Sequence, residues 1–177
     1  VIDSVVNVVE YISTKIGSDG FARMSYYDAT NGDLKLIRCT NANCATKVIT
    51  TVDTTGNVGA YTSLALGSDG FARISYYDDT NDDLKFIRCT NADCTAKVIT
   101  TVDAAGDVGK YTSLTFGSDG FARISYYDDT NDDLKFVRCT NADCTTKNIA
   151  TVDSAGTVGS YTSLALGSDG FARISYY

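Results

Sequence analysis

The stretch YTSLALGSDGFARISYYDDTNDDLKFIRCTNADCTAKVITTVDAAGDVGK, residues 61–110, decides the fold of this chain because it recurs along the sequence. The next stretch, 111–160, is identical to it at 41 of 50 positions. Copies this similar adopt nearly the same backbone, so the fold of one unit gives the fold of the chain. We therefore divide the chain at this period into units 11–60, 61–110 and 111–160, a partial unit 161–177, and residues 1–10 as the end of a preceding repeat or connection. Because neither end resembles a natural terminus, we expect the chain to be part of something longer.

Each unit contains four short runs in which apolar and polar residues alternate, bounded by residues typical of turns. In the second unit these predicted strands are residues 61–66, 71–77, 84–89 and 97–102. The first two are joined by the turn Gly67-Ser-Asp-Gly70. In the first unit, the turn between the second and third strands contains Asn31-Gly32, a strong hairpin signal. The unit therefore predicts a four-stranded antiparallel meander.

A meander that recurs every fifty residues is typical of a β-propeller blade. A single sheet with apolar residues on both faces is unstable in water, whereas sheets stacked around an axis cover one another. We therefore predict an all-β β-propeller of four-stranded antiparallel blades, three full repeats plus a partial one, which leaves an incomplete ring in one chain. A β-solenoid and a string of separate small domains are the alternatives.

The motifs also resemble propeller repeats of bacterial and archaeal surface proteins, whose units read approximately SLALxSxGxxxISYYDxTNxDLKxxR followed by TVDxxGDVGxYTS. The matching segments here begin at Ser63, Ile74, Asp83 and Thr101. The chain departs from that pattern at Phe71-Ala-Arg73, in lacking Trp and in adding cysteine pairs. The resemblance implies a propeller outside the cytoplasm and implies no reaction.

The net charge of −7 restricts the partners. Of the 22 acidic residues, all but Glu10 are Asp, a turn former, so the acidity belongs to loops. Nucleic acids and anionic membranes attract basic clusters, which the sequence lacks, so we expect neither nucleic-acid binding nor membrane insertion. We expect one rim of the propeller to carry most of these aspartates, either as a surface for cationic partners or as a solubility surface.

Six cysteines occur as three C-x4-C pairs: Cys39 and Cys44, Cys89 and Cys94, and Cys139 and Cys144. Zinc would need four ligands, yet the sequence contains no His and each unit offers only two thiols. Disulfides are therefore the preferred interpretation over metal ligands, and they indicate an oxidising compartment, extracellular or at the cell surface.

The predicted turn after the second strand is rich in oxygen ligands, which raises the alternative of a calcium site. Its candidate ligands are Asp78, Asp79, Asn81 and Asp83, repeated as Asp128, Asp129, Asn131 and Asp133. The Gly and distal Glu of a calcium loop are missing, so we prefer a hairpin turn and expect no firm metal site and no cofactor.

Arginines recur within strands that otherwise look buried, and a buried guanidinium needs an acidic partner. We predict structural pairs between blades that involve Arg73 with Asp69 or Asp78, Arg123 with Asp119, and also Arg88 and Arg138. A ligand-binding role is the alternative. Tyr76, Tyr77 and Phe71 are interpreted as packing between blades rather than as a sugar-stacking platform.

Catalytic motifs are missing from this sequence. It has no His, no nucleophile elbow and no pair of Glu residues, and Ser68-Asp69-Gly70 lacks the spacing of the sialidase Asp-box. We expect a non-enzymatic secreted or cell-surface propeller that acts in binding, adhesion or surface architecture. The alternatives are a subunit that assembles with further repeats or copies of itself into a ring or filament, and a glycan-binding or glycan-processing propeller. Carbohydrate or a surface protein is the expected external partner.

Overall fold

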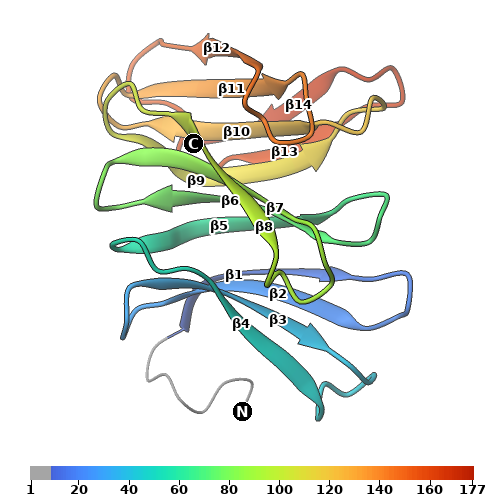
Figure 1. The fold of residues 1–177 in the computed structure, drawn as a ribbon. Helices are drawn as coiled ribbons and strands as arrows, with labels where there is room; N and C mark the ends of the chain where they lie inside the picture. Colours follow the sequence, from blue (N-terminus) through green and yellow to red (C-terminus); the bar gives the residue numbers. More distant parts are fainter. Residues whose placement is uncertain (1–8) are drawn as a thin grey trace.

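The computed structural model describes residues 9–177, and they form strands, turns and connections (Figure 1). Three four-stranded antiparallel sheets and one two-stranded sheet follow one another along the chain, and none closes on itself. The chain is therefore an all-β protein of propeller type with three complete blades and part of a fourth, as the sequence predicts. Residues 1–8 of the expected N-terminal segment lie outside the described part. Within residues 9–177 we find no helix of the length and apolarity needed to cross a membrane.

Each complete blade is a meander in which neighbours in sequence are neighbours in the sheet. The first blade contains β1 (Val9–Ile16), β2 (Ala22–Asp28), β3 (Asp33–Cys39) and β4 (Lys47–Asp53). The second contains β5 (Val58–Leu66), β6 (Ala72–Asp78), β7 (Asp83–Cys89) and β8 (Lys97–Asp103). The third contains β9 (Val108–Phe116), β10 (Ala122–Asp128), β11 (Asp133–Cys139) and β12 (Lys147–Asp153), and the partial blade contains β13 (Ser163–Leu166) and β14 (Ala172–Ser175).

The two larger clusters of the hydrophobic core lie between blades, and a smaller one lies within the first blade. One cluster joins Leu34 and Leu36 of the first blade to Ile74 and Tyr76 of the second, and a second cluster repeats this arrangement between the second and third blades. Strand β6 is buried along its whole length because each of its faces is covered by a different neighbour. Burial of apolar area on both faces is the main stabilising contribution, and it requires the stack of blades (Figure 1).

Polar contacts also join successive blades at positions that the repeat conserves. The backbone N–H of Leu64 donates to Ser13 Oγ at 2.9 Å, and that of Leu114 donates to Ser63 Oγ at 3.1 Å. The hydroxyl of Tyr76 donates to Asp53 Oδ2 of the preceding blade at 2.6 Å. The first strands β1, β5, β9 and β13 lie side by side and form the inner edge of the stack.

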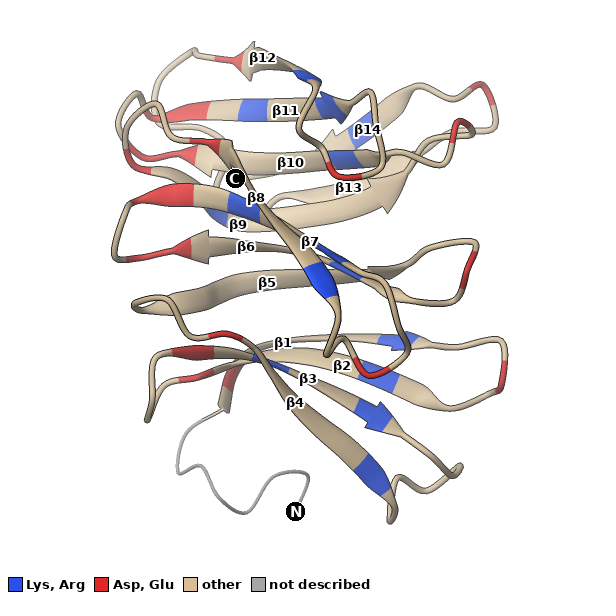
Figure 2. Cartoon of the chain, viewed as in Figure 1, with Lys and Arg blue, Asp and Glu red and all other residues tan. Residues whose placement is uncertain are grey.

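The loops divide between two rims of the stack. We call the β2–β3, β6–β7 and β10–β11 loops, together with the connections between blades, the acidic rim. Where a connection ends, the backbone N–H of Val108, the first residue of β9, donates to Asp82 O of the neighbouring loop at 2.9 Å. The opposite rim carries the Ser-Asp-Gly turns and the disulfide loops. Figure 2 shows Asp and Glu gathered along the first rim, on the left, while the other rim carries both charges.

Candidate functional site

A row of tyrosines lines the inner edge of the stack. Its members, which we call the tyrosine row, recur at the start of each unit: Tyr11, Tyr61, Tyr111 and Tyr161. The ring centroids of successive members lie 4.5, 4.5 and 4.4 Å apart, with the rings tilted by 44° to 53°. Aromatic rings at this separation are in direct contact, so the row forms one continuous aromatic strip.

The backbone beneath the row is strained. The tyrosines have φ angles of 52° to 54°, in the left-handed region that bulky side chains rarely adopt. In β5 the pairing with β6 shifts register between Ala60 and Ser63, so Tyr61 occupies a β-bulge. A non-glycine residue in this conformation costs about 1–2 kcal/mol. The repeat keeps tyrosine here in every copy, and strain of this kind is a marker of functional positions.

Two hollows adjoin the tyrosine row. One is an open groove of about 310 Å³ that runs along the row itself and reaches the threonines next in sequence, such as Thr62 and Thr112. The other, which we call the tyrosine pocket, has a volume of about 330 Å³ and lies toward the acidic rim between Tyr11, Tyr27 and Tyr61. Both fall in the lower range of volumes typical of small-molecule sites.

The second-strand tyrosines support the row from below. The ring of Tyr77 lies 6.2 Å from that of Tyr61, and its hydroxyl lies 2.8 Å from both Asp82 Oδ1 and Asp107 Oδ1. Burial and these two carboxylates raise the pKa of Tyr77, so its hydroxyl keeps its proton. Burial and the neighbouring hydroxyls likewise raise the pKa of Tyr61. The phenols therefore act as neutral donors and aromatic surface.

The residues predicted as alternative calcium ligands are used within the acidic rim. Asp78 is buried and accepts hydrogen bonds from Thr80 N at 3.1 Å and Asn81 Nδ2 at 3.0 Å. These are the hydrogen bonds of an Asp-capped turn, and Asp128 makes the same contacts with Thr130 and Asn131.

The other candidate ligands point elsewhere or lie along the strand. Asp79 accepts a hydrogen bond from Asn57 Nδ2 at 2.7 Å, and Asp129 lies 2.6 Å from Lys110 Nζ. Asp83 and Asp133 begin the third strands, in register with Asp78 and Asp128. Residues 9–177 contain no group of three or more His, Cys, Asp or Glu side chains arranged to hold a metal ion.

Lys85 is the cation that balances the buried aspartates, and the sequence reasoning missed it. Its Nζ lies 2.9 Å from Asp78 Oδ2 and 3.3 Å from Asp53 Oδ2 of the preceding blade. Burial alone would lower the pKa of Lys85, but the two carboxylates outweigh it and raise the pKa. Its recurrence as Lys35 and Lys135, at an alternating strand position, was the available signal.

The predicted arginine pairs require a correction. Arg73 and Arg123 do pair with Asp69 and Asp119, at 2.7 and 2.6 Å, but each pair lies within one blade, because four residues across a tight hairpin return to the same sheet. Arg138 lies 3.8 Å from Asp119 of its own blade. Only Arg88 among the predicted arginines makes an ion pair between blades, with Asp143 of the third blade. Arg38 pairs equivalently with Asp93 at 2.5 Å.

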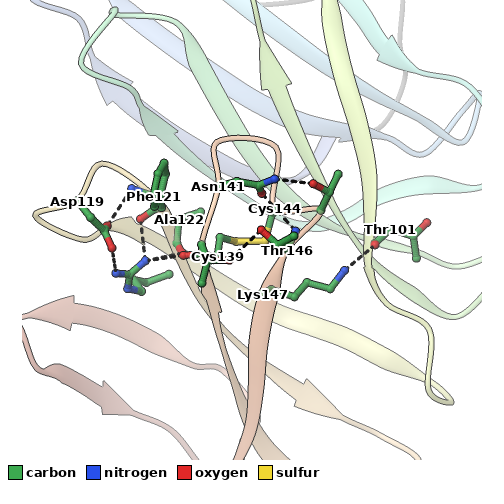
Figure 3. The surroundings of a disulfide bond; sticks show 12 residues. Thr101, Asp119, Phe121, Ala122, Cys139, Asn141, Cys144, Thr146 and Lys147 are labelled. Carbon is green, nitrogen blue, oxygen red and sulfur yellow. Dashed lines mark hydrogen bonds and ion pairs between the residues drawn. A yellow bond between two sulfur atoms is a disulfide. The ribbon is translucent and has the colours of Figure 1, made fainter.

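The three cysteine pairs form disulfides, as predicted, and none of the six cysteines is free. Figure 3 shows the Cys139–Cys144 bond closing a loop in which Asn141 and Thr146 hydrogen-bond, beside the Asp119 turn. Because Asp93 and Asp143 lie in such loops, the disulfides hold the carboxylates that reach the preceding blade.

The predicted packing role of the paired tyrosines agrees with the structure. Tyr76 and Tyr77 are buried and Phe71 packs against the core cluster between the first and second blades, so these rings offer no stacking platform. The tyrosine row is more accessible: its end members Tyr11 and Tyr161 are 40% and 70% exposed, and its inner members are partly exposed. The signal in the sequence was a tyrosine that follows Val-Gly-X in the connections, a position that strand alternation treats as ordinary.

These features define the class of the protein as a tandem-repeat β-propeller. No family model and no curated protein sequence matches the chain. Among solved structures it resembles the NanB sialidase from Streptococcus pneumoniae, with a TM-score of 0.63 and 12% identity over 92% of this chain and 26% of that one. It also resembles the leech intramolecular trans-sialidase, with a TM-score of 0.62 and 16% identity over 96% of this chain and 29% of that one. At such identities the likeness shows the fold alone, and this chain spans just over a quarter of either protein.

Proposed function

We propose that this chain belongs to a non-enzymatic propeller, secreted or held at the cell surface, that binds its ligand along the tyrosine row. The observation that carries the proposal is the strained aromatic strip: every copy keeps a tyrosine at a φ near 53°, and the four rings line a groove beside the tyrosine pocket. Strain retained at an aromatic position that lines a groove in every copy indicates selection for that surface, since glycine would relieve the strain.

The extracellular setting is supported by the cysteines. All six are paired in short local loops, and durable disulfides form and persist in oxidising compartments. The binding role is supported by the chemistry of the row, which combines aromatic surface with hydroxyls and nearby carboxylates, a combination common at polar-ligand sites. The carboxylates near the row accept hydrogen bonds from turn residues or pair with lysines, contacts that suit a structural role better than acid–base chemistry.

Removal of one ring tests this proposal. We expect Tyr61→Ala to weaken binding to glycan and extracellular-protein arrays about tenfold or more, because a central aromatic contact is lost. Ile99→Ala is the matched control, since Ile99 is an exposed apolar side chain on the outer strand β8, 38% exposed. Array binding that is the same in the native chain and the Tyr61 variant would contradict the proposal.

A glycan-processing propeller is the second candidate, favoured by the fold-level likeness to two sialidases. Incubation of the disulfide-bonded chain with a panel of reporter glycosides, sialosides included, separates the two candidates. Turnover that survives purification and is lost in an acidic-rim variant such as Asp79→Asn would replace binding by catalysis as the function.

A further inference from the structure

Two positions beside the tyrosine row differ in charge between otherwise similar copies. Units 61–110 and 111–160 differ at few positions, and the only differences in formal charge are Asp107 against Thr157 and Lys110 against Ser160. In the first unit the same positions hold Asn57 and Ala60. The aromatic strip is thus constant, whereas the polar groups next to it vary from copy to copy.

Lys110 shows that an ammonium group fits between the acidic rim and the tyrosine row. Its Nζ lies 2.7 Å from Asp107 Oδ2, 2.6 Å from Asp129 Oδ2 and 5.4 Å from the centroid of the Tyr77 ring. The two carboxylates and the ring face provide ion pairing and a cation–π contact for one ammonium group. The junction of the second and third blades therefore contains a site for a lysine side chain that the chain itself fills.

The equivalent place one blade earlier is open. Tyr27 takes the position of Tyr77, Asp79 that of Asp129, and Ala60 stands where the lysine would begin. The tyrosine pocket, about 330 Å³, lies at this place, and Tyr11, Tyr61, Glu10 and the already paired Lys110 also line it. Asn57 replaces Asp107, accepts a hydrogen bond from the Tyr27 hydroxyl at 2.5 Å and donates one to Asp79 at 2.7 Å, so the Asp79 carboxylate contacts an amide here, whereas Asp129 contacts a lysine.

We propose that the tyrosine pocket binds a primary alkylammonium group, the lysine side chain of a polypeptide partner, in the place that Lys110 fills in the next copy. This inference rests on the proposed function and names the ligand of one part of the same surface. The methylene stem of a lysine packs on the tyrosine rings while its ammonium meets Asp79 and Glu10. Anionic ligands are disfavoured, because the one lysine in the wall is already paired with two carboxylates.

The repeat itself supplies the test. Ala60→Lys transplants the residue that the same backbone carries fifty positions later, so the variant is expected to fold and to fill the pocket from within. Binding of Nα-acetyl-lysine N-methylamide to the disulfide-bonded chain is followed by NMR shifts of the Ala60, Asp79 and Tyr27 amides. We expect saturable shifts in the native chain and at least about tenfold weaker binding in the variant. Thr54→Ala, which copies the alanine of the next unit on the same rim, is the control and keeps native binding.

The choice of probe separates the possible results. The Nε-acetylated lysine probe, which lacks the charge, is expected to bind at least about tenfold more weakly. Equal binding of both probes, unchanged binding in Ala60→Lys, or preference for glucosamine over the lysine probe would overturn the assignment. If the lysine probe fails while array binding still depends on Tyr61, the inference fails and the proposed function stands; if neither depends on the tyrosine row, both fail.

Discussion

Gly109 illustrates how closely successive blades approach at the level of single residues. It has a φ of 109°, and a Cβ built on it would lie 2.7 Å from Leu84 Cα and 2.9 Å from Leu84 Cβ. The neighbouring atoms belong to the backbone and the base of a side chain, which cannot swing away. Gly59 and Gly159 stand in the same relation to Leu34 and Leu134.

We therefore expect Gly109→Ala to lower the free energy of unfolding by about 3 kcal/mol, because strain at positive φ adds to a steric clash in the core. Gly70→Ala is the control: its φ is 77°, but nothing lies within 4 Å of the added Cβ, so about 1 kcal/mol is expected. Urea titration of both variants measures the difference, and equal losses would show that the close approach to Leu84 is relaxed in solution.

The ion pairs of Lys85 are a second feature that belongs to the residue scale. Lys85→Met leaves the buried carboxylate of Asp78 without its cation, and removal of one partner of a buried pair costs about 3–5 kcal/mol. We expect a loss near the lower end of that range, because hydrogen bonds from Thr80 and Asn81 still reach Asp78. Lys97→Met on the outer strand is the control in the same thermal melts. A loss no larger than the control's would mean that Asp78 simply takes up a proton.

At the scale of elements, the disulfide loop connects the third and fourth strands of its own blade and also contacts the preceding blade. Cys89 ends β7, and Asp93 within the loop pairs with Arg38 of the first blade. The loop of the first blade differs, because it carries Asn43, whose side chain accepts a hydrogen bond from Ala45 N of the same loop.

This difference gives a prediction with an internal control. Replacing Cys39 and Cys44 together by Ser should cost about 2 kcal/mol, the chain-entropy value for so short a loop. Replacing Cys89 and Cys94 should cost about 1 kcal/mol more, since the Arg38–Asp93 pair between blades loosens as well. Denaturant unfolding of the two double variants under identical conditions measures the difference. A larger loss for the first-blade pair would contradict the role of the loop in joining blades.

The sequence was sufficient to predict the bounds of most strands, but not the start of the inner strand β5. The four runs of residues 61–110 match β5 to β8, because alternation and turn residues act locally. The inner strand begins earlier than predicted, at Val58, since its bulge at Tyr61 interrupts the alternation on which the assignment rested. Pairing of Arg88 with Asp143, 55 residues away, also lay beyond local reasoning because it depends on how blades stack.

At the scale of the whole molecule, the distribution of buried carboxylates sets how stability depends on pH. Burial alone would raise the pKa of Asp78, but hydrogen bonds from Asn81 and Lys85 outweigh it and lower the pKa. The pKa of Asp53 is lowered in the same way: hydrogen bonds from Tyr76 and the backbone outweigh the effect of its burial. Burial raises the pKa of Asp83, which acts in the opposite direction.

We expect stability to be constant from about pH 5 to pH 10 and to fall on both sides. A carboxyl with a lowered folded pKa contributes stability above its unfolded pKa of about 3.9, and that contribution is lost as the pH falls through the folded value. Lys85, whose pKa is raised, contributes below about 10.4 and loses that contribution as the pH rises through its folded pKa. Thermal melts from pH 2 to pH 12 measure this profile. Stability that increases below pH 4 would show that carboxyls with a raised pKa, such as Asp83, dominate the acid side of the profile.

The sequence by itself determined the repeat, the four strands of each blade, the local disulfides and the acidity of the turns, because all of these follow from residues close together in the chain. Only the tertiary structure decided that Asp143 pairs with Arg88 of the preceding blade, and only stacking brought the four tyrosines into one row. The physical reason is the same in each case: the sheets bury their faces against one another, and the contacts between copies depend on the geometry of that burial rather than on spacing along the chain.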